Sequence, residues 1–280
     1  MEKECQFMEY CDGQNPTAGP LRVEAGQASD IGLVRPLNED SILTLQLVVG
    51  EGSKSVCFGL YAVADGVGGY EGGEIASALA LRVVTSSILQ SLIIPELQRD
   101  TKGSGWEHVS QVLTDGVRAA NDRIQAEGQA RGNRMGTTLT AALIINGTAH
   151  IANVGDSRAY LLERDQLRQI TADHSLVAML VTAGELTPEE IYTHSQRNII
   201  TRCLGTKSEV EVDLFTERLG SGSALLLCSD GLWEMIRDDH IRDAILHSEN
   251  AQDACDQLVA TANRNGGADN VSVVVLKTHA

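Results

Sequence analysis

Four aspartates stand where an apolar run of the sequence meets a turn. Asp65 follows YAVA, Asp156 follows ANVG, Asp230 follows LLLCS, and Asp269 precedes NVSVVV. Each would be presented at the end of a rigid strand. Taken singly, each is an ordinary turn residue, because Asp favours turns. Four such residues indicate a shared role, since carboxylates that converge repel one another unless cations neutralise them.

The chemistry that converging carboxylates serve is the binding of hard cations. Oxygen-only ligands select Mg²⁺ or Mn²⁺, and two such ions lower the pKa of a shared water and present hydroxide to a phosphorus atom. An anionic substrate also needs a positive anchor. Arg35, in RPLNED, carries a planar guanidinium suited to phosphate oxygens. The other interpretation of Arg35 is an ion pair with the neighbouring Glu39 and Asp40 in a strand-entry loop.

The composition excludes several classes of protein. The 280 residues carry 22 Lys and Arg against 38 Asp and Glu, a net charge of −16, with only 4% aromatic residues. Binding to nucleic acid or to an anionic membrane needs clustered cations and, for single strands, stacking aromatics. We therefore expect neither partner. Most of the acidic excess is solubility charge, which predicts that substrates with basic residues beside the phosphate are favoured.

The termini and the cysteines indicate a cytoplasmic protein. The N-terminus MEKECQFMEY has acids where a signal peptide has a basic start, and no stretch approaches the ~18 uninterrupted apolar residues of a membrane span. The six cysteines are scattered without a CxxC pair, which is typical of core thiols. The histidines include no HxxxH or HxxH pair, so a zinc site is not expected.

The order of the expected elements favours antiparallel sheets with helices packed outside. Residues 1 to about 20 are expected to form a flexible lead-in, and residues 21–280 a single domain. We predict strands at 41–50, 56–64, 137–145, 149–154, 158–163, 211–217, 223–229 and 270–277, and helices at about 73–97, 106–126, 238–247 and 250–264. Two helices followed by a strand meander do not alternate as a βαβ series would. The Asn146-Gly147 step predicts a hairpin.

Seven motifs occur in one order along the chain: RPLNED, VADGVGGYEGGEIAS, MGTTLTAAL, ANVGDSRAYLL, TADHS, LLLCSDGLWE and GGADNVSVVVL. Together they resemble the ordered motifs of the metal-dependent serine/threonine protein phosphatases, the PPM or type 2C family, from about Gly26 to Leu276. The resemblance implies an α+β fold, a four-layer α/β/β/α sandwich of two central antiparallel sheets flanked by helices. A binuclear metal site would lie at one edge.

The resemblance also implies a role for each metal-site residue. Asp65 would bridge two divalent cations, Mn²⁺ or Mg²⁺, and the Gly66 carbonyl would complete the second site. Asp230 and Asp269 would hold the first. Asp156 matches the position associated with a weaker third ion in bacterial members. All of these positions are intact in the sequence.

The remaining site residues differ in how closely they follow the family. Asp40 and Glu39 would act mainly through metal-bound waters, and Arg35 would hold the substrate phosphate. The animal enzymes often carry a His directly after the Asp-Gly pair, proposed as general acid, where this chain has Val67. Val cannot donate a proton, so water would protonate the leaving group. The DGVGG string is closer to the prokaryotic form and favours a bacterial-type member.

The resulting hypothesis is an enzyme that hydrolyses phosphoserine and phosphothreonine in proteins. A metal-bridging hydroxide would attack directly, with no phosphoenzyme intermediate. The partners would be phosphorylated proteins in signal transduction, opposing a Ser/Thr kinase, and the enzyme would be a monomer. Residues 173–205 correspond to the family's variable flap. The alternative is a non-catalytic phosphatase-like module that binds phosphoproteins or regulates a partner, although the loss of a metal ligand that would mark it is not seen.

Two short strings resemble the motifs of other enzyme classes but depart from them. GVGGYEGG resembles a dinucleotide-binding turn but places Glu71 where the third glycine is needed, and GDSRA lacks the second glycine of a serine-hydrolase elbow. His174 is expected to be structural rather than catalytic, and Trp233 to pack in the core behind Asp230. Asn270 is either a support for the site or a strand cap.

Overall fold

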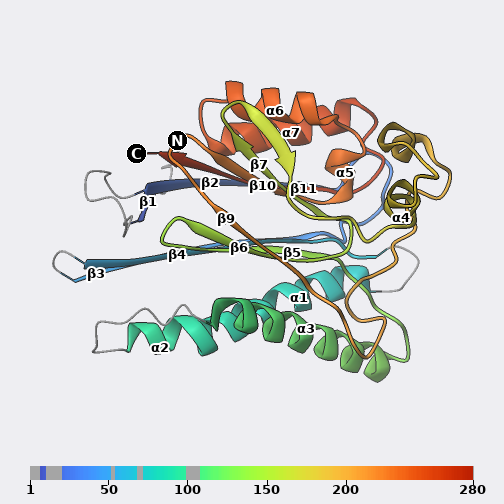
Figure 1. The fold of residues 1–280 in the computed structure, drawn as a ribbon. Helices are drawn as coiled ribbons and strands as arrows, with labels where there is room; N and C mark the ends of the chain where they lie inside the picture. The colour runs from blue at the N-terminus through green and yellow to red at the C-terminus, as the bar shows by residue number, and fades with distance from the viewer. Residues whose placement is uncertain (1–6, 11–20, 52–53, 68–71, 99–107, 280) are drawn as a thin grey trace.

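The computed structural model describes residues 7–10, 21–51, 54–67, 72–98 and 108–279. Within them, two antiparallel β-sheets stack face to face, and helices cover the outer face of each sheet (Figure 1). The chain therefore has the four-layer α/β/β/α arrangement that the motifs predicted.

The first sheet contains six strands in the order β1-β2-β11-β10-β7-β8. Their bounds are β1 Phe7–Tyr10, β2 Leu21–Asp30, β7 Arg158–Glu163, β8 Gln166–Gln169, β10 Ala224–Cys228 and β11 Val271–His279. The second sheet contains five strands in the order β3-β4-β5-β6-β9. These are β3 Ser41–Glu51, β4 Lys54–Ala64, β5 Leu139–Ile145, β6 Thr148–Val154 and β9 Asp213–Arg218.

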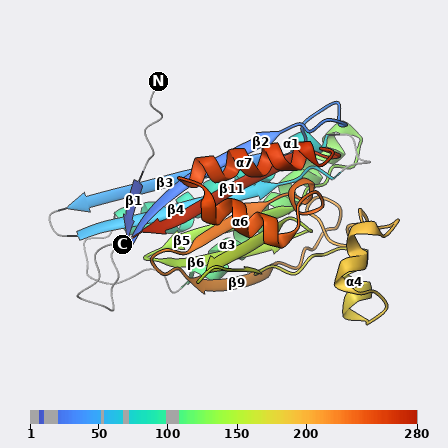
Figure 2. The same ribbon diagram turned by 90° about the horizontal axis from the view of Figure 1, so that it is seen from above.

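The helices form the two outer layers. The second sheet is covered by a helical run, α1 Gly73–Ile88, a π-helical turn Leu89–Ile93 and α2 Ile94–Leu97, and by α3 Val109–Arg131. The first sheet is covered by α5 Asp230–Trp233, α6 Asp238–His247 and α7 Ala251–Arg264. The short helix α4 Leu176–Thr182 stands out from one end of the sandwich (Figure 2). A 3₁₀ turn, Pro188–Thr193, follows it.

The strands alternate between two cores, as the two-residue period of a strand requires. In β4, Leu60 packs with side chains of α1 and α3, whereas Tyr61 and Val63 face the first sheet between the layers. A third core lies between the first sheet and α6 and α7. Because helices cover the outer faces, β4 and β5 are apolar on both sides, which explains their continuous apolar sequences.

Several elements differ from the prediction. β1 pairs with β2, so the expected flexible lead-in does not hold for residues 7–10, and residues 1–6 and 11–20 lie outside the described residues. β2 and β8 were not predicted as strands. α3 continues to Arg131, five residues beyond the predicted end, and closes at Gly132 in the left-handed region. The Asn146-Gly147 hairpin is confirmed, with φ angles of 49° and 76° that both lie in that region.

The run Gly73–Leu97 is long and apolar enough, by length and composition alone, to cross a membrane. Its side chains Ala76, Ala80 and Val84 pack into the core beneath the second sheet. A core helix of a globular domain passes the same test of length and composition. The run is therefore weak evidence for a span, and the expected absence of a membrane partner stays a prediction.

Candidate metal centre

Five aspartates meet at one end of the sandwich because of the strand directions. In the second sheet, β4 and β6 are both antiparallel to β5 and therefore run in the same direction. Asp65 and Asp156, which follow β4 and β6, therefore lie at the same end of the sheet. β3 begins at that same end of the sheet, directly after Asp40. In the first sheet, Asp230 follows β10 and Asp269 precedes β11, its antiparallel neighbour. The structure thus gathers the predicted acids from two sheets.

The acids are close enough to change one another's pKa. The side chain of Asp65 lies close enough to those of Asp40 and Asp230 to act on the pKa of both. Burial, followed by the charges of Asp40 and Asp230, raises the pKa of Asp65 well above its usual range. Burial raises the pKa of Asp40 to about 6, and burial with the charge of Asp173 raises that of Asp156 to about 7. The fold therefore holds negative groups together against their repulsion.

The carboxylate side chains of this cluster fit hard cations in their chemistry. Among the described residues, no set of three or more His, Cys, Asp or Glu side chains is already grouped as a metal site. The Oδ1 atoms of Asp40, Asp156 and Asp230 are nevertheless buried without a hydrogen-bond partner. Buried polar atoms are almost always satisfied, and carboxylate oxygens are the ligands of Mg²⁺ and Mn²⁺. Divalent cations would supply the missing partners.

Hydroxyl groups of the strand ends hold the carboxylate of Asp40 and the backbone of Asp65. Ser229 Oγ donates to Asp40 Oδ2 at 2.8 Å, and Ser272 lies close enough to lower the pKa of Asp40. The Asp65 backbone N–H donates to Thr138 Oγ1 at 3.0 Å, and Thr137 Oγ1 donates to the Asp65 carbonyl at 2.8 Å. None of these four hydroxyl residues was predicted from the sequence. Their signal is a buried polar residue at the end of an otherwise apolar strand.

The turn that carries Asp156 is held by two aromatic rings. Trp233 Nε1 donates to the Asp156 carbonyl at 3.0 Å. This core residue, expected to pack behind Asp230, therefore also supports the turn that carries Asp156. The Gly155 N–H donates to His174 Nδ1 at 2.9 Å. The neutral ring then carries its proton on Nε2, which lies 3.2 Å from Asp213 Oδ2. His174 therefore has the structural role expected of it.

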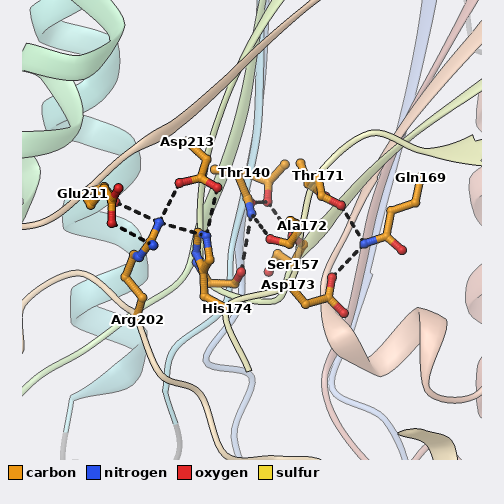
Figure 3. Close-up of polar contacts among 12 residues, drawn as sticks. Thr140, Ser157, Gln169, Thr171, Ala172, Asp173, His174, Arg202, Glu211 and Asp213 are labelled. Atoms are coloured by element: carbon orange, nitrogen blue, oxygen red, sulfur yellow. Dashed lines mark hydrogen bonds and ion pairs between the residues drawn. The ribbon is translucent and has the colours of Figure 1, made fainter. Parts of the chain in front are cut away.

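A polar network surrounds His174 (Figure 3). On one side, Arg202 Nη1 donates to Asp213 Oδ1 at 2.6 Å and lies 2.9 Å from His174 Nε2. On the other, Thr140 Oγ1 donates to Asn153 Oδ1 at 2.6 Å, and Asn153 Nδ2 donates to the Ala172 carbonyl at 3.3 Å. The network connects the second sheet to the segment around residue 173, and these hydrogen bonds support the turn that carries Asp156.

Arg35 lies at the edge of the acid cluster. Its Nη2 atom donates to Asp269 Oδ2 at 2.6 Å, and its side chain is 38% exposed. The ion-pair alternative proposed Glu39 and Asp40 as partners, but the partner in the structure is a predicted metal ligand 234 residues away. The guanidinium is therefore beside the carboxylates and still accessible to solvent.

Asn270 joins the Arg35 loop to the start of β11. Its Nδ2 atom donates to the carbonyls of Ile31 and Leu37 at 2.9 and 3.0 Å, and its Oδ1 atom accepts the Glu39 N–H at 2.8 Å. The structure thus decides between the two interpretations of Asn270. Its amide supports the site by holding the loop that carries Arg35 against Asp269.

Glu39 and Gly66 meet the start of α1 at close range. A Cβ atom on Gly66 would lie 2.6 Å from the backbone carbon of Gly73, and one on Gly73 would lie 2.6 Å from Glu39 Oε1. The Glu39 carboxylate accepts a hydrogen bond from the Gly73 backbone. Gly66 is required by this packing because a Cβ there would meet backbone, whereas a Cβ on Gly73 would first displace the Glu39 side chain. The water-mediated role of Glu39 stays a prediction.

The predicted flap, residues 173–205, contains α4 and the 3₁₀ turn and returns to the site at both ends. Arg197 Nε donates to Glu234 Oε2 at 3.1 Å. Leu204 and Thr137 exchange backbone hydrogen bonds of 2.8 and 3.2 Å. Since Thr137 also binds the Asp65 carbonyl, the end of this segment is tied to the central aspartate.

The raised pKa values predict how the pH changes the stability of the cation-free protein. An unfolded Asp releases its proton near pH 4, whereas folded Asp40 and Asp156 hold theirs to about 6 and about 7. Raising the pH through this window therefore lowers the free energy of unfolding. We expect the chelated protein to unfold at a lower temperature at pH 7.5 than at pH 5, values that span this window.

Calorimetry with and without Mn²⁺ checks this expectation. Saturating Mn²⁺ should remove most of the difference between the unfolding temperatures at the two pH values, because bound ions keep the carboxylates ionised in the folded state. Asp156→Asn should weaken the pH dependence in chelator. A chelated wild-type protein that is equally stable at the two pH values would contradict the raised pKa values.

The comparisons with known proteins agree with this geometry. A family model described as protein phosphatase 2C matches residues 37–271. The serine/threonine phosphatase stp of Listeria welshimeri is 36% identical over 217 residues, 77% of this chain and 82% of the relative. The crystal structure of the Mycobacterium tuberculosis serine/threonine phosphatase PstP/Ppp matches with a TM-score of 0.76 at 35% identity, covering 92% of this chain and 99% of that one. The PstP catalytic domain in complex with two manganese ions matches with a TM-score of 0.73 at 34% identity, over 93% and 100% of the chains.

Proposed function

The chain belongs to the protein phosphatase 2C family, and from this membership we propose the reaction that its site performs. It is a metal-dependent serine/threonine protein phosphatase, which hydrolyses phosphoserine and phosphothreonine. The observation that carries this conclusion is the cluster of strand-end carboxylates with buried, unpartnered oxygens, beside the accessible guanidinium of Arg35.

The carboxylates are the proposed cation ligands. Two divalent cations, Mn²⁺ or Mg²⁺, are the cofactors, and when bound they activate a water and neutralise phosphoryl charge. We assign Asp65 to both ions, with Gly66 contributing its carbonyl to one and Asp230 and Asp269 completing the other. The charges of Asp40, Asp156, Asp230 and Asp269 all act on the pKa of Asp65, which supports its central place.

Three further acids complete the proposed ligand set. Asp40 is oriented by Ser229 and is assigned, with Glu39, to water-mediated contacts. Asp156 is assigned to a weaker third ion, because its Oδ1 atom is buried without a partner and its charge acts on both Asp65 and Asp230.

Arg35 is the proposed anchor for the substrate phosphate. Its guanidinium offers several donors in a fixed plane, and Asp269 accepts from one of them, the Nη2 atom. Cations would occupy Asp269 and release Arg35 toward phosphate oxygens. Arg35 would then orient the phosphoryl group and stabilise the charge that spreads over its oxygens in the transition state.

The leaving group has no protein acid at the position after Gly66. Val67 stands there, and its backbone N–H donates to the Gly136 carbonyl at 3.0 Å. A water must therefore give the proton to the departing serine or threonine oxygen. We propose direct attack of water on phosphorus, with no phosphoenzyme intermediate.

Phosphate release with and without metal tests the proposal. The purified chain with Mn²⁺ is expected to hydrolyse a phosphoserine peptide and p-nitrophenyl phosphate, and excess chelator should lower both rates by at least about a hundredfold. Mn²⁺ or Mg²⁺ added back should restore them. Folded protein that binds the phosphopeptide with Mn²⁺ but releases no phosphate would favour the alternative, a non-catalytic binding module.

The wider setting of the enzyme stays at the level of prediction. Phosphoproteins are its substrates, as the names of its relatives imply. An opposing Ser/Thr kinase, a monomeric state, the absence of membrane and nucleic-acid partners, and a cytoplasmic location rest on the sequence arguments above. We propose residues 21–280 as the catalytic domain.

A further inference from the structure

The loop around Arg35 exposes four large apolar side chains. Leu33 and Val34 are 69% and 68% exposed, more than any other large apolar residue among those described, and Leu37 and Ile31 are 50% and 39% exposed. Single exposed apolar residues are normal on a protein surface. Four within seven residues form a patch of the kind that marks an interaction site. We call residues 31–37 the apolar loop.

Hydrogen bonds hold the two ends of the apolar loop together. The carbonyls of Ile31 and Leu37 both accept from Asn270 Nδ2. These bonds close the loop at its base, so that the residues between them form its tip. The Gly32 N–H donates to Asp30 Oδ1 at 2.8 Å, and Asn263 Nδ2 donates to the same oxygen at 3.0 Å.

The tip of the loop is fixed against the segment before β11. The Leu33 N–H donates to the Gly267 carbonyl at 2.8 Å. Gly32 has a φ of +79°, and a Cβ atom there would lie 2.3 Å from the Asp269 carbonyl oxygen. The backbone is thus packed against its support, and the loop has no room to turn inward. Its apolar side chains are held in solvent by a preorganised backbone.

The apolar loop is continuous with the proposed reaction site. Arg35 lies within it, directly after Val34, and pairs with Asp269. Adjacent Cα atoms are about 3.8 Å apart, and an extended peptide advances about 3.3–3.6 Å per residue. A phosphoresidue held by Arg35 would therefore bring the two or three residues on either side of it within reach of Leu33 and Val34.

We propose that the apolar loop is a specificity-determining surface, which binds apolar side chains beside the phosphoserine or phosphothreonine of a protein substrate. The inference rests on the proposed phosphatase function and names the substrate segments that the same site prefers. An anionic lipid surface is a poorer occupant, because the chain carries a net charge of −16. Burying Leu33 and Val34 against a peptide removes apolar surface from water, which favours binding.

A pair of phosphopeptides of equal charge tests the proposal. One carries Leu and Val at the two positions on each side of phosphoserine, and the other carries Ser at all four. With Mn²⁺, we expect the wild-type enzyme to show a kcat/KM about tenfold higher on the apolar peptide. The variant Leu33→Ser/Val34→Ser should bring the two values within about twofold of each other, because it removes the contact surface.

Matched variants separate recognition from folding. Leu246→Ser changes a partly exposed leucine of α6 and should keep the wild-type ratio between the peptides. Val34→Ser alone should lower the ratio of the two kcat/KM values by less than the double variant does. Thermal unfolding checks that each variant is folded, and the ratio is measured within one enzyme preparation, so a general loss of activity does not change it.

Two results would overturn the inference and one would overturn the function beneath it. Wild-type enzyme that cleaves p-nitrophenyl phosphate but shows equal kcat/KM on both peptides would show that flanking apolar residues are not recognised. A concentration-dependent dimer in sedimentation experiments that Leu33→Ser/Val34→Ser abolishes would assign the loop to a second copy. No turnover of p-nitrophenyl phosphate with Mn²⁺ would instead contradict the phosphatase activity itself.

Discussion

Asp65→Asn is expected to lower kcat/KM on p-nitrophenyl phosphate by about a thousandfold. Asn keeps the shape of the side chain and the backbone hydrogen bonds to Thr137 and Thr138, but it removes the charge that we assign to both cations. The charges of the four other aspartates of the site all act on Asp65, so the substitution changes the centre of the proposed ligand set. Initial rates at saturating Mn²⁺ and the Mn²⁺ affinity from calorimetry measure the effect.

The control for this variant is an identical substitution outside the site. Asp122→Asn changes an exposed carboxylate on α3 and should leave the rate unchanged. In chelator, Asp65→Asn should unfold at the same temperature as the wild type or at a higher one, because it relieves repulsion among buried acids. An Asp65→Asn enzyme with near wild-type turnover would show that the site is misassigned.

Arg158→Met is expected to lower the free energy of unfolding by about 3–5 kcal/mol. Arg158 is 4% exposed. Its Nε and Nη2 atoms donate to the Asp173 carboxylate at 3.0 and 2.6 Å, and its Nη1 atom donates to the Tyr160 hydroxyl at 2.8 Å. The guanidinium also lies 3.6 Å from the centre of the Trp233 ring. Methionine would fill the space but leave the buried Asp173 charge without its cation.

Urea unfolding in excess chelator measures this effect without a contribution from bound ions. Arg168→Met removes a surface ion pair with Glu217, from an arginine side chain that is 51% exposed, and should cost less than about 1 kcal/mol. The double variant Arg158→Met/Asp173→Leu should recover part of the loss, since an apolar pair needs no counter-charge. Equal effects of Arg158→Met and Arg168→Met would contradict the importance of burial.

The elements with strong local patterns were predicted well. β7 and α6 have the predicted bounds, 158–163 and 238–247, because apolar periodicity and polar turns mark them locally. β2 was missed because LRVEAGQASD contains few β-branched or aromatic residues. It forms a strand because β11 pairs with it along nine residues, from Asp30–Val271 to Arg22–His279. A partner distant in the sequence thus overrides a weak local preference.

The residues of the site also divide into those that the local sequence marks and those whose role depends on distant partners. Four of the five aspartates were found because each lies where an apolar strand meets a turn, and Asp40 was assigned through the resemblance of RPLNED to a family motif. Asn270 was singled out beside Asp269, but its role stayed open. Ser229 and Thr138, which also support the site, carry no such mark, since serine and threonine are common in any turn. Their roles depend on which strands become neighbours.

The sequence by itself determined that this chain carries strand-end carboxylates, the arginine of RPLNED and the elements of a helix-covered sandwich. These features depend on residue type and short-range spacing. Only the tertiary structure decided that Arg35 meets Asp269 and that Asn270 closes the apolar loop, across 234 and 239 residues of chain. The physical reason is that sheet pairing and helix packing bring distant segments together, and only then do their charges and hydrogen bonds act on one another.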